Sequence, residues 1–242
     1  MAAPRSRKSP VIVITGASQG IGAAVAAAFA RGVPGARLAL LARNVKNLQR
    51  VAARCERGGA TALAVACDVT DESSVAEAAT AVTTTIGVPD VLVNNAGRFA
   101  GASFLEMPLA EFDALITDNL RSVFLVSKAF IPEMARRGRG HVFNMSSIAG
   151  RDAYPNGSGY CAAKFGVAGL SAVMRRELRE RGVQVTTVFP GATWTPSWEG
   201  SGTTAERMMP AEGVAQAIVE AWRLGLRTVV EELVLRPPGG DL

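Results

Sequence analysis

A chain of 242 residues, 48% of them hydrophobic, is long enough for one large α/β domain with a substantial core. No apolar run reaches the roughly 18 residues that span a membrane, so we expect no membrane partner. The three cysteines are too scattered for a disulfide framework or a zinc site, which favours a reducing, cytoplasmic location and no metal. The net charge of +5 comes from dispersed residues without an aromatic platform or reader motif, which argues against nucleic-acid binding.

Short apolar or β-branched runs alternate with longer segments of helical pattern. The predicted strands cover residues 11–15, 36–42, 61–67, 90–94, 141–146, 184–189 and 232–235. The predicted helices cover residues 20–31, 44–57, 71–86, 109–137, 158–181 and 210–224. Near-continuous apolar strands separated by helices indicate a parallel sheet covered on both faces. We therefore predict a single domain, residues 1–242, with a Rossmann-type, doubly wound α/β sheet of seven mainly parallel strands.

Two segments stand outside this alternation. Residues 1–9 are basic and precede the first strand, and we expect them to form a flexible tail. Residues 192–209 are rich in Gly, Ser, Thr and Trp, and a loop this long inside a compact domain is usually functional. It follows the carboxyl end of a predicted strand, where doubly wound sheets bind ligands. We expect residues 192–209 to form a mobile lid over the substrate.

The first predicted strand runs directly into a glycine-rich turn, T-G-A-S-Q-G-I-G, at residues 15–22. Glycines in a strand-to-helix turn let the backbone approach a pyrophosphate, whose charge is met by the helix N-terminus. The spacing of Gly16, Gly20 and Gly22 is G-x-x-x-G-x-G, which differs from the usual G-x-G-x-x-G fingerprint. The turn predicts a dinucleotide-binding site.

The same turn also matches the nucleophile elbow G-x-S-x-G, with Ser18 at its centre. A hydrolase of that kind needs a histidine, and the chain has only His141, at the start of a predicted strand. Aspartates such as Asp68 and Asp90 are nominally available as the acid, but the elbow would have to follow the first strand of the chain. The pattern therefore disfavours a hydrolase.

The end of the second strand distinguishes between the two nicotinamide dinucleotides. An NAD site usually has an acidic residue about 20 residues beyond the glycines, bonded to the adenosine ribose. There is no Asp or Glu between Arg31 and Glu56, and Arg43, Asn44 and Lys46 stand at this place. A guanidinium suits a 2′-phosphate, so we predict NADP(H) over NAD(H). The alternative is an ordinary surface arginine at the start of a helix.

Tyr160 and Lys164 lie four residues apart in a predicted helix, so they share one face, about 5–6 Å apart. A cation beside a phenol lowers the tyrosine pKa from its usual value of about 10, which makes the tyrosine usable as an acid or base. Ser147 precedes Tyr160 by thirteen residues. The alternative for the pair alone is a core tyrosine beside a surface lysine.

Together these motifs resemble the short-chain dehydrogenase/reductase family over essentially the whole chain. Residues 15–22 resemble its cofactor turn and C-D-V (67–69) its adenine-holding segment. N-N-A-G (94–97) resembles its sheet-supporting motif and P-G-A-T-W-T (190–195) its nicotinamide loop. The resemblance implies that the cofactor is bound by Gly16, Ser18, Gln19, Gly20, Ile21, Gly22, Arg43, Asn44, Asp68, Val69, Asn95, Ala96, Gly97, Tyr160, Lys164, Pro190, Gly191, Thr193 and Thr195.

The resemblance also implies four catalytic residues, Asn119, Ser147, Tyr160 and Lys164. Tyr160 would donate a proton to the carbonyl oxygen while hydride moves from the nicotinamide, and Ser147 would hydrogen-bond the same oxygen. Lys164 would lower the tyrosine pKa and hold the nicotinamide ribose, and Asn119 would position a relay water. Ser146 is the competing serine, and a mid-helix Asn119 would instead bond backbone if its role is structural.

The implied activity is the NADP(H)-dependent interconversion of a carbonyl and an alcohol in a small-molecule substrate. The tail at 228–242 and the segment 190–198 look similar to bacterial sepiapterin-reductase-like members, whereas the general pattern equally resembles 3-oxoacyl-carrier-protein reductases. Sepiapterin-like diketones and 3-oxoacyl thioesters are therefore the two candidate substrates. Asp241 is a candidate pterin anchor, against the alternative of an exposed terminal residue.

Several features stay open at this stage. Trp194 and Trp198 would either line an aromatic-accepting pocket or cap the apolar underside of the lid. A catalytically silent NADP(H)-binding sensor on the same fold is the alternative function, because fold alone does not establish chemistry. The resemblance implies a homodimer or homotetramer that associates through the helices at 109–137 and 158–181.

Overall fold

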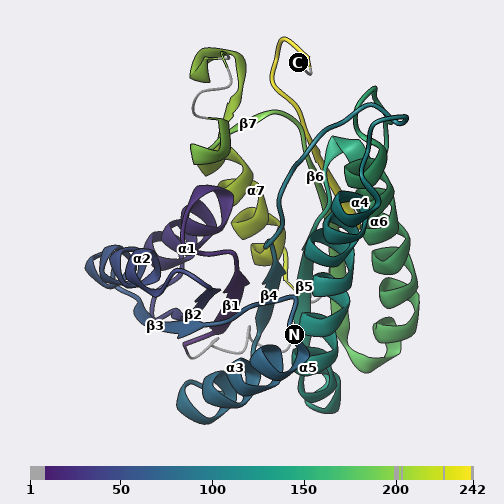
Figure 1. Cartoon of the computed structure of the whole chain (residues 1–242). Helices are drawn as coiled ribbons and strands as arrows, with labels where there is room; N and C mark the ends of the chain where they lie inside the picture. The colour runs from purple at the N-terminus through teal and green to yellow at the C-terminus, as the bar shows by residue number, and fades with distance from the viewer. Residues whose placement is uncertain (1–8, 199–201, 203, 226, 241–242) are drawn as a thin grey trace.

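Seven strands form one sheet in the order β3-β2-β1-β4-β5-β6-β9, and every neighbouring pair is parallel (Figure 1). The strands are β1 Val11–Thr15, β2 Arg37–Ala42, β3 Thr61–Ala66, β4 Val91–Asn94, β5 Gly140–Met145, β6 Val183–Pro190 and β9 Glu232–Leu235. The predicted doubly wound sheet is confirmed, with all seven strands parallel. The strand order reverses between β1 and β4, and sheets of this kind bind ligands at that reversal.

The computed structural model describes residues 9–198, 202, 204–225 and 227–240. The predicted tail at 1–9 therefore lies outside the described residues except for its last position. The same holds for 199–201 and 203 of the predicted lid, and for Asp241. None of the helices in the described ranges is long and apolar enough to cross a membrane.

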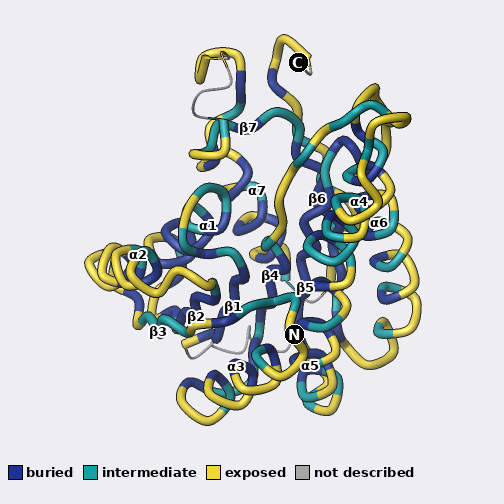
Figure 2. Tube along the Cα trace, viewed as in Figure 1, coloured by how far each residue is buried: buried dark blue, intermediate teal, exposed yellow. Residues whose placement is uncertain are grey.

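Helices cover both faces of the sheet (Figure 1). The helices are α1 Gly20–Gly32, α2 Val45–Arg57, α3 Glu72–Thr85, α4 Leu109–Ile116, α5 Ser122–Arg136, α6 Ser158–Leu178 and α7 Ala211–Arg223. Side chains of α1, α2 and α7 share one core cluster with Ile12 and Ile14, whereas α3, α5 and α6 share the other with Val11 and Val13. Successive residues of β1 thus point into opposite layers, as the period of two in a strand requires. Figure 2 shows the resulting buried sheet between exposed outer helix faces.

The predicted single helix at 109–137 is wrong in one place. A π-helical turn, Thr117–Arg121, separates α4 from α5. The side-chain amide of Asn119 donates to the carbonyl oxygen of Leu115 at 3.0 Å, the oxygen that would accept the backbone N–H of Asn119 in a regular α-helix. Competition of this kind for a helical carbonyl explains why the helix changes its pitch here.

The predicted lid at 192–209 contains more regular structure than a loop in its described part. Two short strands, β7 Thr193–Trp194 and β8 Met209–Pro210, pair in parallel. Single 3-10 turns lie at Pro196–Trp198 and Ala205–Arg207. The segment stands at the carboxyl ends of the strands, above α1 and α7 (Figure 1).

Candidate active site

The glycine turn between β1 and α1 is closed by backbone contacts. Gly16 and Gly20 adopt positive φ angles of 63° and 55°, which favour glycine. A Cβ added to Gly22 would lie 2.4 Å from the carbonyl oxygen of Gly16, so no side chain fits there. Gln19 is the exposed N-cap of α1 and makes no side-chain capping bond, and the first turn of α1 contains no acid. The helix N-terminus is therefore available to an anion.

Asn95 ties this turn to the end of β4. Its side-chain amide donates to the carbonyl oxygens of Thr15 at 2.9 Å and Gly16 at 3.3 Å. The backbone N–H groups of Asn95 and Ala96 donate to the hydroxyl of Thr15 at 2.9 and 3.0 Å. Ile21 packs on the core cluster below, and Ser18 stays partly exposed. Two of the predicted motifs, T-G-A-S-Q-G-I-G and N-N-A-G, thus form one bonded unit.

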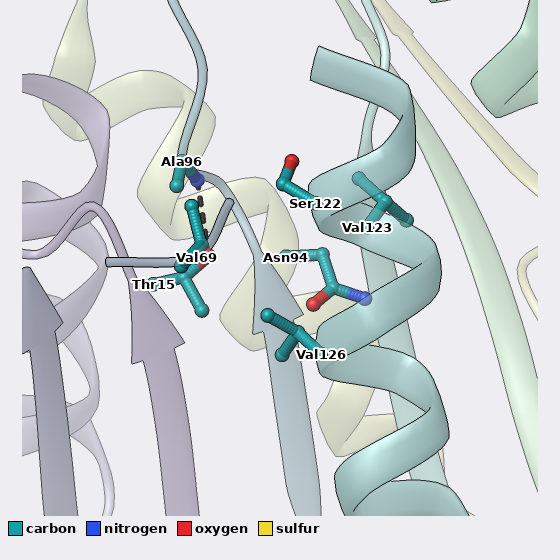
Figure 3. Close-up of a pocket in the computed structure, with 7 residues that line it drawn as sticks. All are labelled: Thr15, Val69, Asn94, Ala96, Ser122, Val123 and Val126. Carbon is teal, nitrogen blue, oxygen red and sulfur yellow. Dashed lines mark hydrogen bonds between the residues drawn. The ribbon is translucent and has the colours of Figure 1, made fainter. Parts of the chain in front are cut away.

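Figure 3 shows the hollow beneath this junction, between β1, β4 and α5. It is lined by Thr15, Val69, Asn94, Ala96, Ser122, Val123 and Val126. The hollow does not admit a water molecule, so it is a packing gap and not a ligand cavity. The amide of Asn94 donates to Asn144 at 2.8 Å and to Ser127 at 3.0 Å, which links β4 to β5 and α5.

The ends of β2 and β3 form the corner where the sequence predicts the adenosine end of a cofactor. Asp68 accepts hydrogen bonds from the backbone N–H and the hydroxyl of Thr70 at 3.0 and 2.7 Å. These bonds lower the pKa of Asp68, and the nearby charge of Arg43 lowers it further. Arg43 itself is exposed. Asn44 caps α2 by accepting from the N–H of Asn47 at 3.0 Å, so its side chain has a structural task.

Ser147 and Tyr160 lie close together on the other side of the point where the strand order reverses. Ser147 caps the 3-10 turn Ile148–Gly150, accepting from the N–H of Ala149 at 3.2 Å, and its hydroxyl donates to the carbonyl oxygen of Pro190 at 3.4 Å. Tyr160, in the first turn of α6, is partly exposed and lies close enough to Ser147 for that hydroxyl to lower the tyrosine pKa. Two hydroxyl groups therefore converge at the carboxyl end of β5.

The neighbouring serine has a different place. Ser146 is buried and donates to the carbonyl oxygen of Lys164 at 2.8 Å. A Cβ added to Gly150 would lie 2.3 Å from the hydroxyl oxygen of Ser146, so this contact leaves no space. Ser146 thus bonds the backbone of α6, and Ser147 is the serine that lies near the Tyr160 hydroxyl and lowers its pKa.

Lys164 is only 5% exposed, and its ammonium group donates to the carbonyl oxygen of Met145 at 2.9 Å. The Nζ atom lies 5.5 Å from the centroid of the Tyr160 ring. Burial disfavours the charged form and lowers the pKa of Lys164 to about 8. The group therefore still carries most of its charge near neutral pH.

The predicted lowering of the Tyr160 pKa by Lys164 is wrong for this structure. Burial raises the pKa of Tyr160, and the hydrogen bond with Ser147 opposes that rise without overcoming it. The reason is that desolvation penalises a phenolate, while the ammonium of Lys164 lies over the ring and is bonded to Met145. The tyrosine accordingly keeps its proton over a wider pH range than a free phenol.

Asn119 is fully buried in the π turn, with its side chain bonded to backbone. Its amide donates to the carbonyl oxygens of Arg98 at 2.9 Å and Leu115 at 3.0 Å. Its oxygen accepts from the N–H of Arg98 at 3.2 Å. A Cβ on Gly97 would lie 2.5 Å from that oxygen and 3.7 Å from the ammonium of Lys164. Asn119 therefore lies close to the lysine, and its relay role stays a prediction.

Arg98 and Phe99, which directly follow N-N-A-G, lie at the site although the sequence motifs did not predict them. The guanidinium of Arg98 donates to Asp118 at 2.5 Å and forms a two-pronged pair with Glu111 at 2.5 and 3.3 Å. The ring of Phe99 packs edge-on against the ring of Tyr160, with centroids 5.2 Å apart. The only available signal was an arginine and an aromatic residue directly after a recognised motif.

The predicted nicotinamide loop lies against the glycine turn. A Cβ on Gly20 would come within 3.3 Å of the methyl group of Thr195. The N–H of Gly191, which follows Pro190, donates to the carbonyl oxygen of Leu235 at 2.7 Å, and the buried Thr193 donates to the carbonyl oxygen of Gly191 at 2.9 Å. A groove of about 340 Å³ runs along this contact and is lined by Gln19, Gly20, Ala23, Ala24, Arg54, Trp194, Thr195, Pro196, Ala211 and Glu212.

The arrangement combines an open helix N-terminus for an anionic cofactor with a proton donor, a second hydroxyl group and a buried cation. A tyrosine that holds its proton can protonate an oxygen that gains negative charge, and the adjacent serine can hydrogen-bond the same oxygen. The site therefore has the groups that carbonyl reduction requires once a hydride source is bound.

A family model for short chain dehydrogenases matches residues 10–206. Sepiapterin reductase of Chlorobaculum tepidum is 35% identical over 238 residues, which cover 96% of this chain and 98% of the relative. D-threitol dehydrogenase of Mycolicibacterium smegmatis is 37% identical over 205 residues, which cover 83% and 78%.

Solved structures agree with this relationship. An alcohol dehydrogenase from Thermococcus sibiricus, complexed with 5-hydroxy-NADP, superposes with a TM-score of 0.89 at 31% identity, covering 97% of this chain and 99% of that one. A metagenomic short-chain oxidoreductase in complex with NADP has a TM-score of 0.82 at 35% identity, covering 95% and 97%. The chain is thus an oxidoreductase and belongs to the short-chain dehydrogenase family.

Proposed function

We propose that this protein is an NADP(H)-dependent reductase that interconverts a carbonyl and an alcohol, with Tyr160 as the proton donor and acceptor. The observation that carries the proposal is the placement of Tyr160 beside Ser147, with the buried ammonium of Lys164 over the tyrosine ring. The bound nicotinamide would supply the hydride. In the reverse direction, alcohol oxidation, Tyr160 would accept the proton.

Each residue has a distinct task in this mechanism. The raised pKa of Tyr160 keeps its proton in place until the carbonyl oxygen gains negative charge. Ser147 stabilises that charge with a hydrogen bond, at a site where donors are already oriented. Lys164 would offset the phenolate once the proton has left, and it would hold the ribose of the cofactor. Asn119 would position a water that returns protons toward Lys164.

The preference for NADP(H) rests on the corner at β2 and β3. Arg43 is exposed there, and no acidic residue lies between 32 and 55 to repel a 2′-phosphate. The glycine turn, which has no space for a Cβ at Gly22, and the open N-terminus of α1 fit a pyrophosphate. Similar structures in complex with 5-hydroxy-NADP, NADP or NADPH support the assignment.

Sepiapterin-like diketones and 3-oxoacyl thioesters are the candidate substrates. Similarity to a sepiapterin reductase over nearly the full length supports the first class. We further propose a cytoplasmic homodimer or homotetramer, and that 192–209 closes over the substrate. A silent NADP(H)-binding sensor is the competing function.

The test is NADPH consumption by the purified protein with a panel of ketones, diketones, acetoacetyl thioesters and sepiapterin. Tyr160→Phe should lower kcat/KM about a thousandfold while NADPH still binds, because a positioned acid contributes roughly 10²- to 10⁴-fold. Thr80→Val, which removes an exposed hydroxyl group from α3, is the control and should leave turnover intact. NADPH binding without turnover of any compound would favour the sensor, and a fully active Tyr160→Phe would refute the mechanism.

A further inference from the structure

Phe99 places an aromatic ring beside the proposed proton donor. Its ring meets the ring of Tyr160 edge-on, with centroids 5.2 Å apart and planes at 90°. Phe99 is nevertheless 57% exposed, so more than half of its surface is available to another molecule. An aromatic side chain that contacts a reactive group and still faces solvent is an unusual use of apolar surface.

The backbone around Phe99 is fixed on both sides. Before it, the N–H and carbonyl groups of Arg98 are both bonded to the buried side chain of Asn119. After it, the N–H of Ala102 donates to the carbonyl oxygen of Asn156 at 3.1 Å, which joins this loop to the segment leading into α6. A Cβ on Gly101 would lie 3.1 Å from the Phe99 ring, so the chain passes closely behind it. The ring is therefore held in place before a substrate arrives.

The polar side chain of this segment, that of Arg98, is already bonded to acidic residues. The guanidinium of Arg98 is bonded to Glu111 in the first turn of α4 and to Asp118 in the π turn. In the proposed mechanism the hydroxyl of Ser147 serves the reacting oxygen, and the ammonium of Lys164 serves the phenolate and the cofactor ribose. The side chain that this segment presents beside Tyr160 is consequently the apolar ring of Phe99.

We infer that Phe99 determines specificity by selecting carbonyl substrates that carry a planar ring next to the reacting carbonyl, in preference to small polyols and aliphatic ketones. The inference rests on the proposed function and concerns the group attached to the carbonyl. Aromatic pairs contribute enough beyond simple burial to change kcat/KM roughly two- to tenfold, and the burial of exposed ring surface adds to that preference.

The experiment uses two diketones that differ in one substituent. Purified wild-type protein with NADPH is assayed on 1-phenyl-1,2-propanedione and on 2,3-butanedione, and the ratio of their kcat/KM values is measured. We expect the phenyl compound to be preferred at least tenfold. Phe99→Ala should reduce this ratio about fivefold or more, and Phe99→Leu, which keeps apolar volume without a ring, should fall between.

Phe104→Ala is the matched control. Phe104 lies in the same loop and is 82% exposed, but no ring contact joins it to Tyr160 among the described residues, so the ratio should not change. A Phe99→Ala variant that loses activity equally on both diketones would overturn the inference, because the ring would then act only by holding Tyr160. A wild-type preference for 2,3-butanedione would also overturn it while leaving the proposed reductase activity intact. Consumption of neither diketone, nor of any compound in the panel, would instead defeat the proposed function and the inference with it.

Discussion

The cofactor side of the site, residues 15–22 and 94–97, is closed by backbone contacts, whereas the substrate side, residues 98–105 and 151–157, is held by ion pairs that water can reach. On the cofactor side an added methyl group at Gly22 would overlap the chain itself. Forcing atoms into such packing costs about 1–3 kcal/mol, while an exposed ion pair is worth about 0–1 kcal/mol.

The ion pairs of the substrate side come from distant parts of the chain. Arg98 pairs with Glu111, and Arg151 pairs with Glu232 at 2.9 Å. Phe99 and Phe104 on the same side are exposed. Loops held in this way can change sequence without disturbing the core. The difference suggests that hydride chemistry is built into the rigid half of the molecule and substrate choice into the adjustable half. Four substitutions test that division.

Lys164 lies between the two sides of the site. The burial of its ammonium group should have the largest effect of the four on the free energy of unfolding. Its pKa is about 8 in the folded protein against 10.5 when free, so the charged form is disfavoured by folding. This penalty is complete below pH 8 and is relieved as pH rises toward 10.5, because only the unfolded chain still holds the proton there. The free energy of unfolding of wild type relative to Lys164→Met should therefore rise by roughly 3 kcal/mol across that window.

Urea unfolding at several pH values checks this. Lys128→Met, which removes an exposed lysine of α5, is the matched control. If the difference in free energy of unfolding between wild type and Lys164→Met stays constant with pH, burial of the ammonium group is not costly.

Gly22→Ala should destabilise the cofactor side of the site. Its new methyl group would lie 2.4 Å from the backbone oxygen of Gly16 and 2.6 Å from the amide of Asn95. We expect a loss of about 2 kcal/mol, which for a domain of this size lowers the melting temperature by roughly 6 °C, together with weaker NADPH binding. Gly213→Ala, in α7, meets nothing closer than 3.9 Å and should raise stability by about 0.5 kcal/mol. Equal melting temperatures for the two variants would contradict the prediction.

Arg43→Ala should affect only the choice of dinucleotide. Loss of a charge-assisted contact to a 2′-phosphate is worth about 1.5 kcal/mol, so KM for NADPH should rise about tenfold while KM for NADH stays the same. Arg50→Ala, an exposed arginine of α2, controls for the general loss of positive charge. If both variants weaken NADPH binding equally, the effect belongs to the overall field of the helix and not to Arg43.

Arg98→Gln should have the smallest effect on stability, about 0.5–1 kcal/mol, because its ion pairs are partly exposed. It should lower kcat more than it changes KM for NADPH, since the segment that Arg98 fastens lies on the substrate side. Arg98→Lys restores charge without the fork and should recover only part of the loss. Arg136→Gln removes a similar exposed pair with Glu133 far along α5 and should leave kcat unchanged. Matching kinetics for Arg98→Gln and Arg136→Gln would remove any role for Arg98.

The sequence predicted the sheet well because each strand is a short, almost uninterrupted apolar run. β1 and β9 begin and end where the pattern placed them, and the other strands differ by one or two residues. The glycine turn and N-N-A-G were also readable, since a turn that needs Gly16 and Gly22 tolerates few alternatives. Local patterns suffice where the constraint is local.

The remaining features depend on contacts between distant residues. The π turn follows from bonds between Asn119 and the backbone of Arg98, which helical periodicity does not report. The direction of the Tyr160 pKa shift depends on burial, which an i,i+4 spacing does not measure. The place of Phe99 at the site depends on the contact of its ring with Tyr160, which no local pattern in the sequence reports.

A π turn is one residue longer than the α-helical turn it replaces, so Thr117–Arg121 acts as a one-residue insertion in a longer helix. Each residue of an α-helix turns the side-chain direction by about 100°. A deletion of one residue here would restore a smooth helix and swing Asn119 or the inward face of α5 out of place. If single residues were deleted one at a time along this helix, deletions at Thr117–Arg121 should therefore be tolerated less well than deletions elsewhere. Substitutions at the exposed positions of the same helix would not show this sensitivity.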